Sequence, residues 1–437
     1  MSFLKSSPAR GALAVRLPIE RFSLSCGAKL LVSHRPQSPV VALQMHLRGG
    51  HSLDERGLEG QAFLTGALLD QGTRRRSEEA IAEILETAGA TISGESNGLS
   101  AAAAAEHWET LLELTAELLT QPTFPTAQVR RQRQRLLDRL QIERDEPRVQ
   151  CDRLFKRLIY GEHWLGRSAT GEIESVARLE RRHLTSFHRR NWVARRAVIA
   201  VCGPTPPAQV AALLDRALAR WTPGEDLPIT MPELPPRAPR CAAFHAAREQ
   251  VHVQLGHLGV RRIDPDYPAL VVMDHVLGAG PGFTNRVAMR LRDELGLAYS
   301  VHASIHSSAG LHPGTFTAYI GTSPDKVPVA IDGFLREMRR LQDEPVGAAE
   351  LATAKDYVVG SFALSFQRAA RRASYMVSAE RFGLGDDYLE QAPKIYAAIT
   401  PEDVQRVARR HLFPDACAAA AAGPISTAGL RRALARR

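Results

Sequence analysis

Length and composition indicate a globular protein with room for two domains. The chain has 437 residues, of which 44% are apolar and 24% are charged, a balance that excludes an intrinsically disordered chain. It contains no apolar run of 18 residues, so we expect no membrane span. Its five cysteines are far apart and form no C-x-x-C motif, which argues against a disulfide scaffold or a cysteine-rich zinc finger.

The positive net charge does not indicate nucleic-acid binding. The charge of +9 arises with 50 arginines and only six lysines, and alanine tracts accompany the arginines. The arginines lie in scattered short runs such as Arg74–Arg76, without the interleaved aromatic residues that stack on bases. We therefore expect no nucleic-acid partner. The unpaired cysteines and the lack of a signal-like start favour a cytoplasmic location, or a periplasmic one if a leader is missing.

The first half of the chain predicts a strand followed by helices. Val41–Leu47 alternates between apolar and other residues, which is typical of a half-buried strand. Ser77 precedes two glutamates and an apolar stripe, and therefore predicts the start of a helix that Gly89 ends. Trp108–Leu119 carries a second apolar stripe with glutamates on its opposite side.

The second half repeats the order of the first. Gln44 and Asp54 recur 210 residues later as Gln254 and Asp264. At an offset of 220, a second set recurs that consists of an Arg-Arg pair, an apolar run, a Gly-Pro pair and a helical segment: Arg189-Arg190 with Gly203-Pro204, and Arg409-Arg410 with Gly423-Pro424. Such self-similarity predicts a duplicated domain.

A proline-rich segment separates the two halves. Residues 223–240 contain six prolines, which fix φ and remove backbone donors, so the segment is expected to be a semi-rigid linker. In the second half, Thr400, Pro401 and Asp403 predict a capped helix start. Strands mixed with helices in each half imply an α+β fold with two homologous domains, residues 18–222 and 241–437.

Three segments in the same order resemble elements of the insulinase/pitrilysin-type zinc metallopeptidases, a family that includes the mitochondrial processing peptidase. They are Gly60–Thr73, Tyr160–Arg167 and Leu291–Ser300. The resemblance covers the chain from about residue 18 to its end. It implies two homologous α+β halves, each with a mostly antiparallel sheet packed with helices.

The segment that resembles the zinc-binding helix has lost every zinc-binding residue. Active members carry H-x-x-E-H there, because two histidines at i and i+4 reach one zinc and the glutamate acts as general base. The resemblance places Phe63, Gly66 and Ala67 at these three positions, and a distal glutamate falls near Asp138 or Arg139. We therefore predict no catalytic residue, no metal and no cofactor in this chain.

The resemblance also implies a role without catalysis. Several family members work as heterodimers in which one subunit has lost zinc and retains an arginine and a tyrosine for substrate; here they correspond to Arg292 and Tyr299. The predicted function is a noncatalytic subunit that binds an extended peptide beside the zinc of a homologous partner. The alternatives are a scaffold, as in the peptidase-derived subunits of respiratory complexes, or a free-standing peptide-binding homodimer.

Two further features have simpler interpretations. Gly278–Gly282 lacks the pattern of a phosphate-binding loop and is expected to be a turn, although family members carry a longer glycine-rich loop there. His302 and His306, with His312 nearby, lie in an alternating stretch that predicts a strand, so a metal there is not expected.

Overall fold

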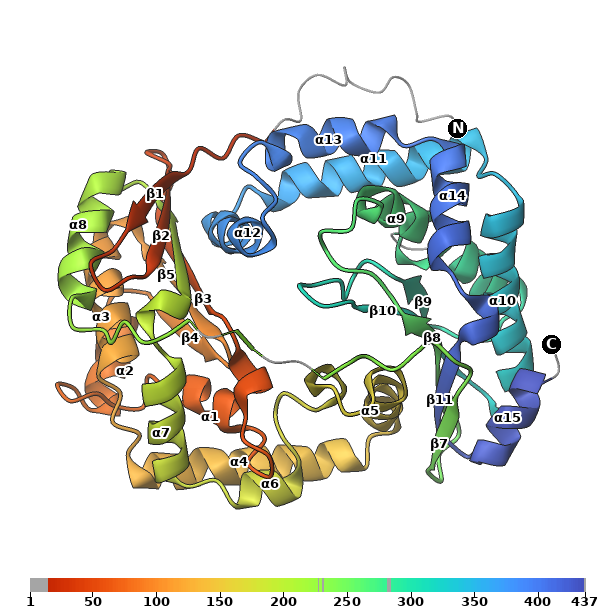
Figure 1. The fold of residues 1–437 in the computed structure, drawn as a ribbon, viewed down its shortest axis with the longest axis horizontal. Helices are drawn as coiled ribbons and strands as arrows, with labels where there is room; N and C mark the ends of the chain where they lie inside the picture. The colour runs from red at the N-terminus through yellow and green to blue at the C-terminus, as the bar shows by residue number, and fades with distance from the viewer. Residues whose placement is uncertain (1–14, 227, 230–231, 281–283, 436–437) are drawn as a thin grey trace. The chain divides into compact units, whose positions relative to one another are not determined.

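The computed structural model describes residues 15–226, 228–229, 232–280 and 284–435. The chain divides into two units (Figure 1). The N-terminal unit contains Pro18–Pro235 and Arg368–Arg381, and the C-terminal unit is built mainly from Pro236–Gln367 and Phe382–Arg437. The main crossing between the units lies within the proline-rich segment, at Pro235 and Pro236. The assignment of Arg368–Arg381 to the N-terminal unit was not predicted, since the sequence analysis placed all residues from 241 onward in one domain.

The N-terminal unit is a six-stranded sheet with helices (Figure 1). Its strands are β1 (Glu20–Ser23), β2 (Lys29–His34), β3 (Val40–Leu47), β4 (Thr91–Glu95), β5 (Gly98–Ala104) and β6 (Ala197–Gly203). Its helices are α1 (Gln61–Ala67), α2 (Glu78–Thr87), α3 (Trp108–Thr120), α4 (Thr126–Arg144), α5 (Pro147–Tyr160), α6 (Ile173–Ala177), α7 (Arg181–Asn191), α8 (Pro207–Leu218) and α12 (Ala369–Phe382).

The C-terminal unit is a five-stranded sheet with helices. Its strands are β7 (Cys241–His245), β8 (Val251–Leu258), β9 (Val301–Ser304), β10 (Thr315–Thr322) and β11 (Ala418–Gly423). Its helices are α9 (Tyr267–Asp274), α10 (Val327–Asp343), α11 (Ala348–Ser365), α13 (Tyr388–Ala398), α14 (Pro401–His411) and α15 (Thr427–Ala435). The unit also contains two π-helical turns, η5 (His275–Ala279) and η6 (Ala288–Glu294).

The two sheets share one strand order, which confirms the predicted α+β fold with two homologous halves. The order β2-β6-β3-β5-β4 in the N-terminal unit matches β7-β11-β8-β10-β9 in the C-terminal unit. One pair in each sheet is parallel, β2 with β6 and β7 with β11, and the other pairs are antiparallel. Gln44 lies opposite Ala200 and Gln254 opposite Ala420, so the repeated glutamines occupy equivalent places.

The central strands β3 and β8 place their apolar side chains in the cores that the helices complete. On β3, Val41, Leu43 and Met45 are buried in the cluster that the helices complete, whereas Gln44 between them is only partly buried. On β8, Val251, Val253 and Leu255 play the same part. This burial of apolar surface on one side of each sheet is the main source of its stability.

The predicted helix starts and stripes are present. Ser77 accepts a hydrogen bond from the backbone N–H of Ala80 at the start of α2, and Thr400 forms a capping box with Asp403 at the start of α14. The stripe of Trp108–Leu119 lies on α3.

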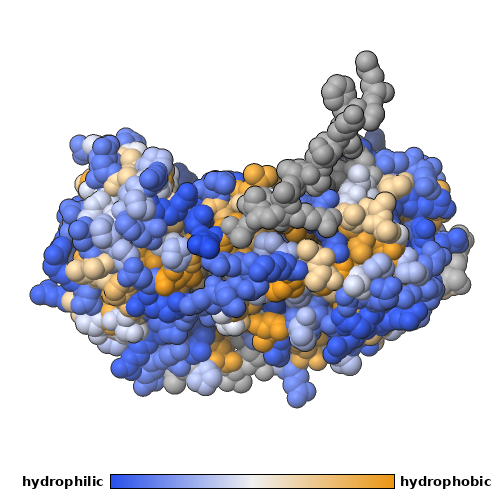
Figure 2. Space-filling view, turned by 90° about the horizontal axis from the view of Figure 1, so that it is seen from above, coloured by the Kyte–Doolittle hydropathy of each residue, from blue (hydrophilic) through white to orange (hydrophobic). Residues whose placement is uncertain are grey.

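No helix among the described residues is long and apolar enough to cross a membrane. Much of the face seen in Figure 2 is hydrophilic, with smaller hydrophobic areas between.

Helix α12 is part of the N-terminal unit although it lies late in the sequence. Lys29 donates from Nζ to Glu380 at 2.8 Å, and Arg21 lies 3.9 Å from the same carboxylate. These contacts join α12 to β1 and β2, at the edge of the sheet opposite β4. Because the contacts are long-range ion pairs, no local sequence pattern indicates them.

Candidate functional site

A partly buried aspartate fixes the start of helix α1, which contains the three motif positions. The carboxylate of Asp54 accepts hydrogen bonds from the backbone N–H groups of Gly60 and Ala62, both at 2.8 Å. Gly60 itself adopts a left-handed conformation with φ of 102°, which a glycine tolerates. Burial raises the pKa of Asp54 to about 7, although the two backbone hydrogen bonds oppose this shift. The helix is therefore held in place from the preceding loop.

The side chains at the motif positions are apolar or absent. Phe63 and Ala67 are partly buried and one turn apart on α1, and Phe63 packs against the hydrophobic core. Gly66 lies between them in the sequence and is fully buried. None of the three offers a nitrogen, oxygen or sulfur atom in its side chain. The residues present at these three positions therefore do not fit zinc.

Gly66 is the point at which α1 meets the sheet. A Cβ atom added to Gly66 would overlap with the backbone carbonyl of Glu95, and one added to Gly94 would overlap with the carbonyl oxygen of Gly66. The two glycines thus allow the backbones of α1 and β4 to touch. A glutamate cannot be accommodated at position 66 without a shift of helix or strand, because both close neighbours are backbone atoms.

The two positions near the expected distal glutamate are bonded along α4. Asp138 is exposed and accepts a hydrogen bond from Gln134 at 2.8 Å, while Arg139 pairs with Glu143 at 2.7 Å. Both are ordinary contacts between residues four apart on one helix. Neither contact links α4 to α1.

The second candidate pair, Arg292 and Tyr299, is brought together in the C-terminal unit. Arg292 lies on the π-helical turn η6, and its guanidinium carbon is 5.4 Å from the centre of the Tyr299 ring. The Tyr299 side chain is 89% exposed, and Arg292 also lies 3.7 Å from the carboxylate of Asp293. Both residues precede β9, the edge strand of the sheet. The geometry is that of a cation–π pair open to solvent.

Two family models match the chain. Residues 29–170 match the model described as insulinase (peptidase family M16), and residues 178–358 match the model described as the peptidase M16 inactive domain. Together they span most of the chain.

The chain belongs to peptidase family M16, the insulinase family. The family predicted from the three segments is thereby confirmed. The word "inactive" in the second model describes the half that carries Arg292 and Tyr299. The three positions that lack zinc-binding side chains, Phe63, Gly66 and Ala67, lie in the segment that matches the insulinase model.

Relatives of this M16 chain carry names that refer to zinc. An uncharacterized zinc protease of Streptomyces coelicolor is 24% identical over 407 residues, covering 90% of this chain and 86% of the relative. Another, from Bacillus subtilis, is 23% identical over 365 residues, covering 80% and 85%. A peptidase M16 inactive domain from Pseudomonas fluorescens has a TM-score of 0.87 at 24% identity, covering 94% of this chain and 99% of its own. A protease from Helicobacter pylori reaches 0.86 at 16% identity, covering 94% and 100%. The two structures show a shared fold.

The histidines of the C-terminal unit serve internal contacts. His306 bonds through Nδ1 to the buried carboxylate of Asp274 at 2.6 Å, and His302 stacks on Tyr319 with ring centres 5.2 Å apart. His312 does not join them in any group of three potential ligands within the described residues. Of Gly278–Gly282, residues 281 and 282 lie outside the described residues; Gly278 packs closely against Ala303.

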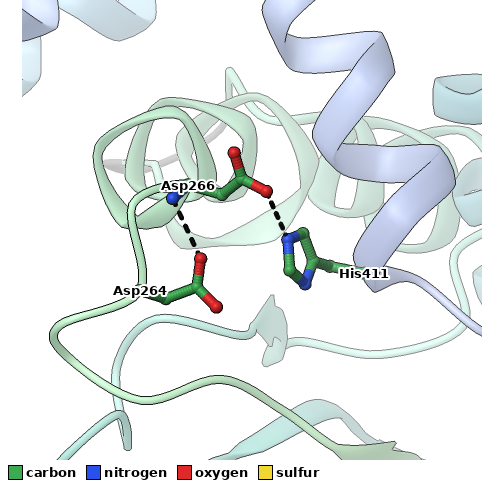
Figure 3. A group of neighbouring side chains, drawn as sticks. All are labelled: Asp264, Asp266 and His411. Carbon is green, nitrogen blue, oxygen red and sulfur yellow. Dashed lines mark hydrogen bonds and ion pairs between the residues drawn. The ribbon is translucent and has the colours of Figure 1, made fainter.

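One cluster with metal-ligand chemistry was not predicted as a site (Figure 3). Asp264 accepts from the backbone N–H of Asp266, and the Asp266 carboxylate accepts from His411 at 2.7 Å. Arg406 and Arg410 also donate to Asp266, at 2.6 and 3.1 Å. Burial would raise the pKa of Asp266, but the hydrogen bonds from Arg406 and His411 outweigh it and lower the pKa. Guanidinium groups on both oxygens leave no place for a cation, so the cluster is an ion-pair network that holds α14 to the start of α9.

One feature of the sequence indicates the close backbone contact at Gly66, although this contact was not predicted. Gly94 interrupts an alternating stretch between Thr91 and Glu95, and an isolated glycine in a strand often marks a close backbone approach. The position of the partner glycine on α1 depends on tertiary packing. It therefore needed the structure.

Proposed function

We propose that this M16 chain is the noncatalytic subunit of a heterodimeric zinc metallopeptidase and contributes peptide binding to a partner's active site. The observation that carries the proposal is the contact between Gly66 and β4. It leaves no room for a glutamate where the family resemblance places the general base, which supports a noncatalytic N-terminal unit. The C-terminal unit, in contrast, exposes a cation–π pair suited to binding.

Arg292 and Tyr299 would bind and orient substrate. A guanidinium presents several donors in one plane, which suits a peptide carbonyl or a carboxylate. The exposed phenol ring offers apolar contact area and a hydroxyl group that can donate or accept. Edge strands β4 and β9 each carry backbone groups that an extended peptide could pair with. Zinc, held by the partner's H-x-x-E-H, would supply Lewis-acid chemistry and the activated water.

Co-purification tests this proposal. A tag on this chain in its native organism is expected to recover an equimolar M16 subunit that contains H-x-x-E-H, with one zinc per pair by elemental analysis. The pair should hydrolyse peptides, whereas this chain alone should not. Recovery of the chain alone, metal-free and self-associated, would overturn the proposal, and zinc bound to the isolated chain would overturn the assignment of Phe63, Gly66 and Ala67.

Substitutions of Tyr299 and Arg292 separate the proposal from a scaffold. Tyr299 is 89% exposed and lies beside Arg292, so its substitution tests binding with little effect on the fold. In the reconstituted pair, Tyr299→Leu and Arg292→Gln are therefore expected to raise the KM for peptides, with the zinc content unchanged. Equal KM values for wild type and both variants would favour the scaffold.

A further inference from the structure

The Arg74–Arg76 run lies in a loop that the fold holds rigidly. The loop follows α1 in the N-terminal unit, and the hydroxyl oxygen of Thr73 accepts hydrogen bonds from the backbone N–H groups of Arg75 and Arg76 at 3.1 and 3.0 Å. The same hydroxyl donates to the buried carboxylate of Glu117 on α3. The backbone of the arginine loop is thus fixed in advance of any ligand.

A hollow of about 710 Å³ lies between this loop, α3 and the end of α8. Its volume is within the range of small-molecule sites, roughly 300–1,000 Å³. Five arginines line it: Arg74, Arg75, Arg76, Arg216 and Arg220. Five arginines also line a second hollow, in the C-terminal unit, but there each of them pairs with a carboxylate. The hollow beside Arg74 is therefore distinguished by how few of its arginines are paired.

The carboxylates of the hollow neutralise only two of the five guanidinium groups. Glu117 pairs with Arg76, and Glu113 lies 3.9 Å from Arg216. Within the described part of the chain, Arg74, Arg75 and Arg220 have no carboxylate partner. The C-terminal carbonyls of α8 account for a cation at position 220, since the end of a helix carries partial negative charge. They do not account for Arg74 and Arg75, which come from the loop.

We propose that this hollow binds a compact anion carrying two or more phosphate groups. Arginine suits phosphate because its planar donors bind two oxygens at once. Among the described residues, no aromatic side chain lines the hollow, so it offers no aromatic ring for a nucleobase to stack on. The recognised chemistry is thus the phosphate chain itself, whether free or attached to a nucleoside. The site is independent of the proposed peptide-binding pair.

Calorimetric titration of the full-length chain tests the proposal, with inorganic tripolyphosphate as the probe at low ionic strength. The expected result is one binding site, with affinity rising from phosphate to pyrophosphate to tripolyphosphate and falling with added salt. ATP is expected to bind within a fewfold of tripolyphosphate, because the base makes no contact. No binding of tripolyphosphate, or ATP binding more than about tenfold tighter, would overturn the proposal.

Matched variants locate the site. Arg74 and Arg75 are exposed, so Arg74→Gln with Arg75→Gln should leave the fold intact. A hydrogen bond to a charged group contributes enough that each loss should cost roughly tenfold in affinity, or about a hundredfold for the pair. The control, Arg130→Gln with Arg135→Gln, removes the same charge from exposed positions on α4 outside the hollow. Equal losses in both variants would show non-specific attraction and overturn the assignment, as would tighter binding of an acidic peptide than of tripolyphosphate.

Discussion

The two places to which family resemblance assigns chemistry differ in their exposure. In the N-terminal unit, Gly66 on α1 is buried against the backbone of β4. In the C-terminal unit, Tyr299 is 89% exposed and lies beside Arg292. Packing against β4 leaves no space beside Gly66, whereas Tyr299 is accessible to a ligand.

The difference predicts that substitutions in the two segments act on different properties, stability in the first and binding in the second. Substitution of a closely packed residue lowers the stability of the fold, because its neighbours cannot move without a loss of free energy. Substitution of a solvent-exposed residue changes stability little, so a large effect on activity must come from binding.

The largest effect is expected at Gly66. Gly66→Glu should destabilise the protein by about 4 kcal/mol or more and prevent folding, because it forces a side chain and a charge into backbone contacts. Gly66→Ala should cost about 3 kcal/mol for the overlap alone. Urea unfolding followed by circular dichroism measures both. The matched control is Gly360→Ala on α11, where nothing lies within 4 Å and alanine should stabilise by about 0.5–1 kcal/mol.

The same contact predicts that the zinc site cannot be restored by reversion. Phe63→His with Ala67→His should fold, because both positions are partly exposed. Adding Gly66→Glu should unfold that variant rather than confer hydrolysis. A folded triple variant with stoichiometric zinc would show that α1 is not closed.

A second large effect concerns pH and the anchor of α1. The pKa of Asp54 is about 7 in the folded protein against an ordinary 3.8, so the native state holds this proton more tightly than the unfolded state. The free energy of unfolding should therefore fall as pH rises from about 4 to 7, by at most about 4 kcal/mol from this group. Asp54→Asn removes that slope, which unfolding curves at pH 5 and 8 would reveal.

Asp266, in the C-terminal unit, supplies the control of opposite sign. The pKa of Asp266 is lowered in the folded protein. Its contribution to stability is therefore fully present above the pKa of the unfolded state, and it is lost as the pH falls through the pKa of the folded state. Asp266→Asn should change stability mainly above pH 4. Parallel slopes for the wild type and Asp54→Asn would contradict the assignment of the slope to Asp54.

An intermediate loss of stability is expected at a buried arginine–tyrosine pair, Arg262 with Tyr267. Arg262 lies 3.8 Å from the centre of the Tyr267 ring, and Tyr267 is only 8% exposed. Tyr267→Leu should cost about 2 kcal/mol in unfolding free energy through lost packing and the lost cation–π contact. Tyr267→Phe retains the ring and should cost far less. A small loss of stability in Tyr267→Leu would mean that the buried pair contributes no more to stability than the exposed pair of Arg292 and Tyr299.

Sequence patterns were sufficient for those parts of the fold that depend on local periodicity or on the repeat. The α2 cap at Ser77, the α14 capping box at Thr400 and the equivalence of Gln44 with Gln254 are all local or periodic features, and all are present. Arg292 and Tyr299 were selected from one short segment that resembles the family, whereas the contact between them was not predicted. Their role in substrate binding stays a prediction.

The features that were not predicted depend on contacts far apart in the chain. Glu380 on α12 pairs with Lys29 across 351 positions, and nothing near either residue indicates it. The ion pairs of Asp266 join a loop to α14 across more than 100 residues. The hollow beside Arg74 needs three elements to meet. Periodicity reports which face of an element is buried, but it does not say which element covers it.

The smallest change in stability is expected at Tyr299. Tyr299→Leu should change the free energy of unfolding by no more than about 0.5 kcal/mol, because the side chain is 89% exposed and an exposed cation–π contact is weak. In the zinc-bearing pair, the same variant should lower kcat/KM for peptides by roughly tenfold, a loss of about 1.4 kcal/mol of binding. A destabilisation as large as that of Tyr267→Leu would make Tyr299 structural. A stable variant with reduced kcat/KM would assign the open pair to substrate binding, since packing could no longer account for the loss.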